Sequence, residues 1–218
     1  MKTKIYLLLI LSLSLFTLSC SDDDDNQPMV DTTPNIVEAA MATGDLSLLV
    51  DALVQADAGL VDLLQTNGPF TVFAPTNEAF ANLLDSLGDD YNSLADFDTA
   101  EEKALLADIL TYHVVAGAAA YSTDLSDGQM IETAQGESIT VSLTGGVFIQ
   151  DATDTDAQVT AADVATSNGV VHIINKVILP QSVIDALTPM PNIVETAMAV
   201  ADLSLLVDAL VQADAGLV

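Results

Sequence analysis

A long internal repeat constrains the fold of this chain more than any other feature of its sequence. Residues 34–61 read PNIVEAAMATGDLSLLVDALVQADAGLV, and residues 191–218 match them at 25 of 28 positions. The offset of 157 residues is the size of a domain and not of a short solenoid unit. We therefore predict a complete domain over 34–187, followed over 188–218 by a linker and the truncated start of a second copy.

The beginning of the chain has the pattern of a secretory leader. Lys2 and Lys4 precede an apolar run over residues 5–18, interrupted only by serine and threonine. Its 14 residues are fewer than the roughly 20 that an apolar helix needs to cross a bilayer. A basic start followed by a short apolar run predicts a signal peptide over 1–19.

The residues after this leader indicate a lipid anchor. Ser19-Cys20 resembles the lipobox of bacterial lipoproteins, and four aspartates follow at 22–25. The resemblance implies cleavage before Cys20, acylation of that cysteine and an outer-membrane lipoprotein exposed at the cell surface. Residues 20–33 then form an acidic, lipid-anchored tether. The alternative is a plain signal peptide with an incidental cysteine.

The charge excludes two classes of partner. The chain carries 32 acidic residues against four lysines and no arginine, for a formal net charge of -28. Such a surface repels nucleic acid and anionic lipid headgroups, so we expect membrane attachment through the lipid anchor only. Half of the residues are hydrophobic, which is enough to build a folded core.

Helices are predicted in the first part of the domain. Asn35 with Glu38, and Thr99 with Glu102, have the form of capping boxes. Leucine and valine recur over 46–54 at helical spacing, which indicates an amphipathic helix. The residues expected to begin the helices are Asn35, Asp45, Asp57, Thr76 and Thr99.

Strands follow this helical part. Residues 70–74 read as a buried strand, and short β-branched runs recur between residues 131 and 179. Gly145-Gly146 and Asn168-Gly169 are hairpin signals between these runs. Helices that precede mostly antiparallel strands predict an α+β fold and not alternating β-α-β units.

Three segments together resemble the fasciclin (FAS1) domain family. They are GPFTVFAPTNEAF at 68–80, YHVV at 112–115 and NGVVHIINKVILP at 168–180. The resemblance implies a FAS1-like β-sandwich wedge with flanking N-terminal helices. It also implies an extracellular adhesion or matrix-interaction role without catalysis and without a cofactor.

The same resemblance supplies the candidate partner-binding residues. Asp163-Val164 matches an Asp-aliphatic pair that lies before the second signature and takes part in receptor contact in animal members. Its flanking residues are alanines here. Tyr112 and His113 match the Tyr-His motif. Each of the four also has a structural interpretation, as packing residues or as a turn acid.

The sequence offers no candidate catalytic or metal site. His113 and His172 are far apart and lack an HExxH pattern, and the acids of 151–156 lack the glycine and terminal glutamate of an EF-hand. We expect an extracellular protein, matrix or glycan as the partner. The alternatives are a passive spacer in a tandem array and an envelope small-ligand or glycan binder. Residues 191–218 could compete for the docking surface of 34–61, within one chain or by exchange in a dimer.

Overall fold

The computed structural model describes residues 33–66, 68–88 and 91–187. The signal peptide, Cys20, most of the tether and the second copy predicted from the sequence lie outside these residues. The helices are α1 (Ile36–Ala42), α2 (Ser47–Gln55), α3 (Leu60–Gln65), α4 (Asn77–Leu87), α5 (Ala100–Tyr112) and α6 (Gln181–Leu187), with 3-10 turns η1 (Gly44–Leu46), η2 (Leu94–Asp96) and η3 (Ser122–Asp124). The strands are β1 (Phe70–Pro75), β2 (Val114–Ala116), β3 (Met130–Glu132), β4 (Ser138–Ser142), β5 (Phe148–Gln150), β6 (Ala157–Thr166) and β7 (Gly169–Ile174).

The strands follow one another in the order β2-β1-β7-β6-β5-β4-β3. β1 and β7 pair in parallel, and the other neighbours pair antiparallel. Five α-helices precede β2, and five of the seven strands follow it. The structure therefore confirms the α+β class, with one parallel pair formed by the second and third strands of this order.

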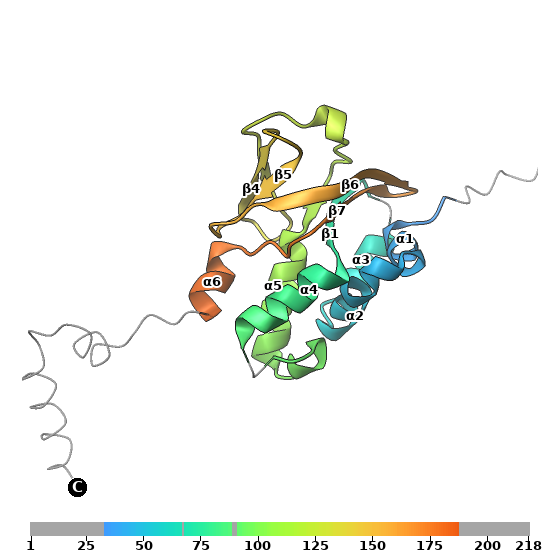
Figure 1. The fold of residues 1–218 in the computed structure, drawn as a ribbon. Coiled ribbons are helices and arrows are strands. Elements are labelled where there is room, and N and C mark those ends of the chain that lie inside the picture. The colour runs from blue at the N-terminus through green and yellow to red at the C-terminus, as the bar shows by residue number, and fades with distance from the viewer. Residues whose placement is uncertain (1–32, 67, 89–90, 188–218) are drawn as a thin grey trace, which may run out of the picture. The chain divides into compact units, whose positions relative to one another are not determined.

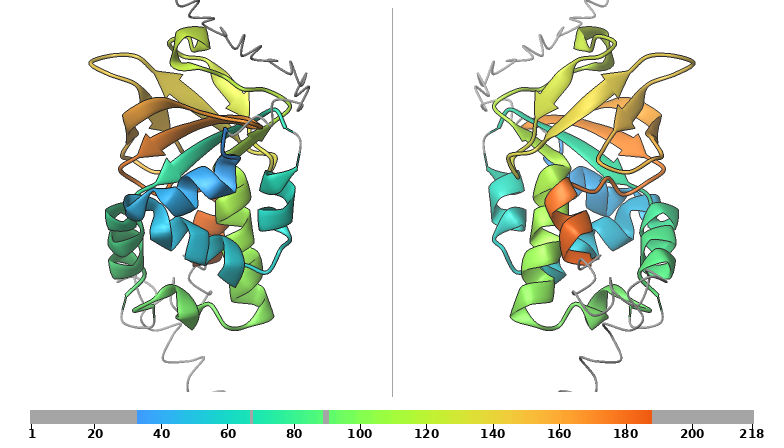
Figure 2. Two further views of the ribbon diagram at one scale, coloured as in Figure 1. Left: turned by 90° about the vertical axis from the view of Figure 1, so that its right-hand side faces the viewer. Right: turned by 90° about the vertical axis from the view of Figure 1, so that its left-hand side faces the viewer.

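Two hydrophobic clusters divide the domain into layers. Alternate residues of β1 enter different clusters, because successive side chains of a strand point to opposite faces. Phe70 and Val72 pack with the helices, whereas Phe73 packs with Ile139 and Ile149 from the strands on the other side. Figures 1 and 2 show helices α1–α5 on one side of β1, β7 and β6, and the β4–β5 hairpin on the other.

Two glycines allow β1 and β7 to approach each other. A Cβ atom on Gly68 would lie 2.0 Å from the carbonyl oxygen of Asn168, and one on Gly169 would lie 2.1 Å from that of Phe70. Backbone atoms cannot yield to such contacts as a flexible side chain could. The glycines of the two signature segments therefore meet at the start of the parallel pair, where Phe70 is the partner of Gly169.

The local caps agree with the sequence in part. Asn35 with Glu38 and Thr99 with Glu102 form the expected capping boxes, and Thr76 accepts a hydrogen bond from the amide of Ala79. The second and third helices are present, but the residues predicted to begin them, Asp45 and Asp57, were wrong.

Both corrections have a physical cause. Asp45 lies within η1, and the amide of Leu48 instead donates to Asn77 Oδ1 of α4 at 2.9 Å. The third helix begins after Gly59, which has a left-handed conformation, and not at Asp57. Tertiary contacts and backbone geometry replace the local caps here, as they often override short-range signals.

Candidate functional site

The candidate residues Asp163 and Val164 lie in the most irregular part of the sheet. Pairing of β6 with β7 shifts register between Val159 and Ala161, and again between Ala161 and Val164. Asp163 has a φ angle of 61°. A β-bulge inserts unpaired residues into a strand and re-aims its side chains. Here it places Val164 at the surface, with 37% of the residue exposed.

The carboxylate of Asp163 is occupied by a neighbouring segment. The backbone amide of Ser122 donates to Oδ1 at 2.6 Å, and the Ser122 hydroxyl donates to Oδ2. These hydrogen bonds hold the pKa of Asp163 below its usual range. The residue therefore acts as an anionic clamp on η3, and its two oxygens already have donors.

His172 binds the backbone on both sides of this contact, at Ala120 just before η3 and at Asp163. Its ring is buried, stacks on Phe73 at 5.5 Å and lies opposite it in the β1–β7 register. Nε2 lies 2.9 Å from the carbonyl oxygen of Ala120, and Nδ1 accepts from the amide of Asp163 at 3.3 Å. A carbonyl only accepts, so the Nε2-protonated tautomer satisfies both bonds.

Thr71 adds a third attachment to this segment. Its hydroxyl donates to the carbonyl oxygen of Ala118 and accepts from the amide of Ala120, both at 2.9 Å. Residues 118–124 are thus held to β1, β6 and β7, and they present Tyr121 with 38% exposure. We call this segment, together with Asp163 and Val164, the bulge surface.

Tyr112 and His113 lie elsewhere, in the protein core. Both residues are 1% exposed. The Tyr112 hydroxyl donates to the carbonyl oxygen of Ser138 at 3.1 Å, and burial, with the negative charges of Asp151 and Glu137, raises its pKa to about 12. This side chain links the end of α5 to β4.

His113 joins three parts of the chain. Nδ1 donates to the carbonyl oxygen of Ile109 at 2.7 Å, and Nε2 accepts from the amide of Ile178 at 3.1 Å. Its own carbonyl oxygen accepts from the amide of Phe73 at 2.9 Å. Burial lowers the pKa of this imidazole to about 4.

This pKa predicts a loss of stability in mild acid. The unfolded chain takes up a proton near pH 6.5, whereas folded His113 stays neutral to about pH 4. The contribution of His113 to the stability of the folded state is complete above pH 6.5. It falls towards pH 4, because only the unfolded state gains the proton in this window. We expect a loss of about 3 kcal/mol in the free energy of unfolding.

Urea unfolding between pH 7 and pH 4 measures this effect when wild type is compared with His113→Gln, which cannot titrate. The contribution of the many carboxylates largely cancels in the difference between the two proteins. The wild type should lose its advantage over the variant as the pH falls. Parallel curves across the window would contradict the assignment.

The acidic segment 151–156 is organised by a cation from the protein itself. Lys176 Nζ lies 2.9 Å from Asp151 Oδ2, and the Asp151 side chain is fully buried. The amides of Thr153 and Leu179 also donate to this carboxylate. In the part of the chain that the structure describes, no three histidine, cysteine or acidic residues are placed to hold a metal ion.

The bulge surface was only half visible in the sequence. Asp163 and Val164 were identified, but Ser122 and Tyr121 lie some 40 residues earlier and carry no motif. Because side chains alternate along a strand, His172 shares one face of β7 with Val170 and Ile174. No local signal connects it to Ala120.

The arrangement defines a class of α+β domain in which a sheet is covered by helices on one face and by further strands on the other. The fasciclin domain model matches residues 44–180. The chain therefore belongs to the fasciclin domain family, as its three signature segments predict.

Relatives in several organisms share this domain. The chain is 40% identical over 156 residues to protein sll1483 of Synechocystis sp. The aligned region covers 71% of this chain and 78% of that protein. It is 34% identical over 148 residues to immunogenic protein MPB70 of Mycobacterium bovis. This aligned region covers 66% of this chain and 68% of MPB70.

A solved structure has the same fold. The FAS1 domain pair from the insect cell adhesion molecule Fasciclin I matches with a TM-score of 0.56 and 18% identity, over 69% of this chain. The chain covers 52% of that pair, about half its length. None of the helices built from the described residues has the length and apolar character to cross a membrane.

Proposed function

We propose that this protein is a non-catalytic adhesion or matrix-interaction module, displayed outside the cell and lipid-anchored through Cys20. Its family membership supports the role, since a solved relative comes from a cell adhesion molecule. The bulge surface is the observation that carries the proposal. It combines exposed side chains of Val164 and Tyr121 with a backbone fixed by Asp163, His172 and Thr71.

The contacts at this surface favour recognition by shape complementarity over recognition through charge or hydrogen bonds. The Asp163 carboxylate has two donors from Ser122, and the imidazole of His172 is bonded on both ring nitrogens. A preordered surface loses little conformational entropy when a partner binds. The partner would be an extracellular protein, matrix component or glycan that covers an aliphatic and an aromatic side chain.

Binding of the full chain to immobilised extracellular matrix tests this proposal. We expect Val164→Ser to weaken binding by about tenfold, as truncation of a central contact does. Leu143→Ser is the matched control, because Leu143 is also 37% exposed but lies beyond β4. Equal binding by both variants and the wild type would remove Val164 from the contact. Failure of the wild type to bind any matrix or glycan would favour the passive spacer.

The proposed anchor has a separate test. Cys20 is the only cysteine of the chain, so acylation should be lost completely in Cys20→Ser. Mass spectrometry of the membrane fraction would detect the lipidated peptide. Recovery of an unmodified wild-type protein from the medium would contradict the anchor and leave the adhesion role untouched.

A further inference from the structure

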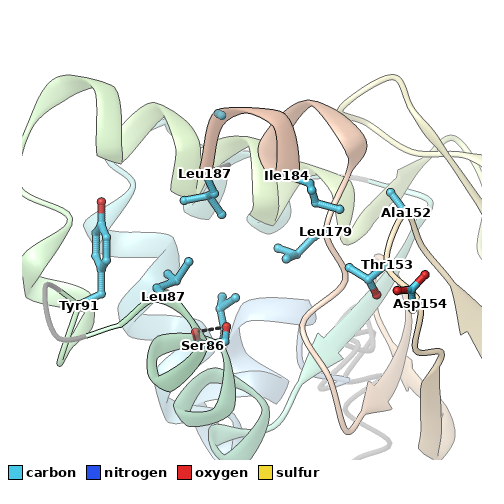
Figure 3. A pocket seen from close by; sticks show the side chains of 11 residues that line it. Ser86, Leu87, Tyr91, Ala152, Thr153, Asp154, Leu179, Ile184 and Leu187 are labelled. Carbon is cyan, nitrogen blue, oxygen red and sulfur yellow. Dashed lines mark hydrogen bonds between the residues drawn. The ribbon is translucent and has the colours of Figure 1, made fainter. Parts of the chain in front are cut away.

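An open groove of about 610 Å³ lies at the C-terminal end of the domain. It runs between the end of α4, the 152–154 loop and α6. Figure 3 shows Leu87 and Leu187 facing each other across it, with Leu179 and Ile184 alongside. Tyr91 stands at one end and Asp154 at the other.

Three of the four polar side chains that line the groove already have partners. The Ser86 hydroxyl donates to the carbonyl oxygen of Leu83 at 2.6 Å, and the Tyr91 hydroxyl donates to Glu102 at 3.2 Å. The Thr153 hydroxyl bonds Asp151 at 2.6 Å. Seven of the eleven residues that line the groove are aliphatic. Such a surface suits a row of aliphatic side chains.

The chain itself supplies such a row of aliphatic side chains shortly after α6. α6 ends at Leu187, which lines the groove, and the second copy of the repeat begins at Pro191. Four extended residues span at most about 14 Å, so Pro191 cannot lie far from the groove. A segment tethered this closely has a high effective concentration at the site.

The first copy shows which side chains form the apolar row. In η1 and α2 the residues Leu46, Leu49 and Leu53 are at most 5% exposed. Asp45 and Asp51 of the same elements are exposed to solvent. The equivalent apolar residues in the second copy are Leu203, Leu206 and Leu210. The same arrangement would present leucines to the groove and keep the acids away from Asp154.

We propose that residues 191–218 seat their apolar row in this groove of the same chain. The alternative seat, which the first copy already fills, is closed. Ile36 and Val37 of that copy are 3% and 1% exposed, and Asn168 binds the amide of Ile36 at 3.0 Å. Displacing the first copy would expose this core, whereas the groove is open. The inference is independent of the adhesion role.

Hydrogen exchange of the full chain tests the seating. Leu206→Asp with Leu210→Asp should speed amide exchange in α6 and in residues 83–88 by about tenfold or more, because the cover is lost. Met198→Asp with Val211→Asp is the matched control. It adds the same charge at positions whose counterparts, Met41 and Val54, are 61% and 64% exposed.

Three outcomes decide the proposal. Faster exchange in the leucine variant alone, with a monomeric wild type by light scattering, supports seating within one chain. Identical exchange in all three proteins overturns it and assigns the groove another occupant or none. A wild-type dimer that the leucine substitutions dissociate also overturns it, because the segment would then be exchanged between molecules.

Discussion

Replacement of Asn168 by alanine should lower the free energy of unfolding by about 3 to 5 kcal/mol, the range expected when several buried hydrogen bonds are broken at once. The Asn168 amide nitrogen donates to the carbonyl oxygens of Leu64 at 2.7 Å and Thr66 at 2.9 Å. Its Oδ1 accepts from the amide of Ile36 at 3.0 Å. One side chain thus holds α1 and the end of α3 against the β6–β7 turn.

The partners of Asn168 explain the size of this effect. Asn168 is 8% exposed, and its alanine variant would leave buried backbone groups of Leu64 and Ile36 without donors or acceptors. Asn168→Asp should be equally damaging, because a carboxylate cannot donate to the two carbonyl oxygens.

Urea denaturation measures the change, with Asn82→Ala as the control. Asn82 lies exposed on α4, and its replacement should shift stability by no more than about 0.5 kcal/mol. Similar midpoints for the Asn168 and Asn82 variants would show that the three hydrogen bonds contribute little.

Replacement of Lys176 by methionine should destabilise the domain by about 3 to 4 kcal/mol, since it leaves a buried carboxylate without its cation. Lys176 Nζ bonds both carboxylate oxygens of Asp151, the Thr153 hydroxyl and the carbonyl oxygen of Thr155. The amide of Leu179 also donates to Asp151. The lysine therefore ties the 151–155 segment to the strand connection that leads to α6.

A matched substitution separates this contact from the general charge of the protein. The chain has a net charge of -28, so loss of any lysine increases self-repulsion. Lys103→Met makes the same change in charge on α5, and we expect an effect below about 1 kcal/mol. Thermal or urea unfolding of both variants gives the comparison.

A double variant completes the experiment. Lys176→Met with Asp151→Asn removes both charges, and we expect it to recover part of the lost stability, because the uncompensated anion is gone. Equal destabilisation by Lys103→Met and Lys176→Met would show that net charge, and not the ion pair, is responsible.

The groove and the bulge surface lie on different parts of the domain. One molecule could therefore hold a segment in the groove and a partner on the bulge surface at the same time. In a tandem protein, seating of the following repeat beside α6 would leave Val164 and Tyr121 exposed for a partner. The two sets of variants, at Val164 and at Leu206 with Leu210, separate these roles experimentally.

Local features of the fold were predictable because they act over a few residues. The capping boxes at Asn35 and Thr99 join groups three residues apart. β1 followed from a continuous apolar run, and the β6–β7 hairpin followed from Asn168-Gly169. The failures at Asp45 and Asp57 arose where a residue from another helix or a left-handed glycine took over the cap.

The sequence by itself determined the α+β order of the elements, the family and the candidate residues, because periodicity, caps and signature segments are local. Only the tertiary structure decided which candidates reach the surface. It buried Tyr112 and His113, and it joined Asp163 to Ser122 across 41 residues. The register of β6 on β7 sets these contacts, and register depends on the packing of the whole sheet, which no short stretch of sequence specifies.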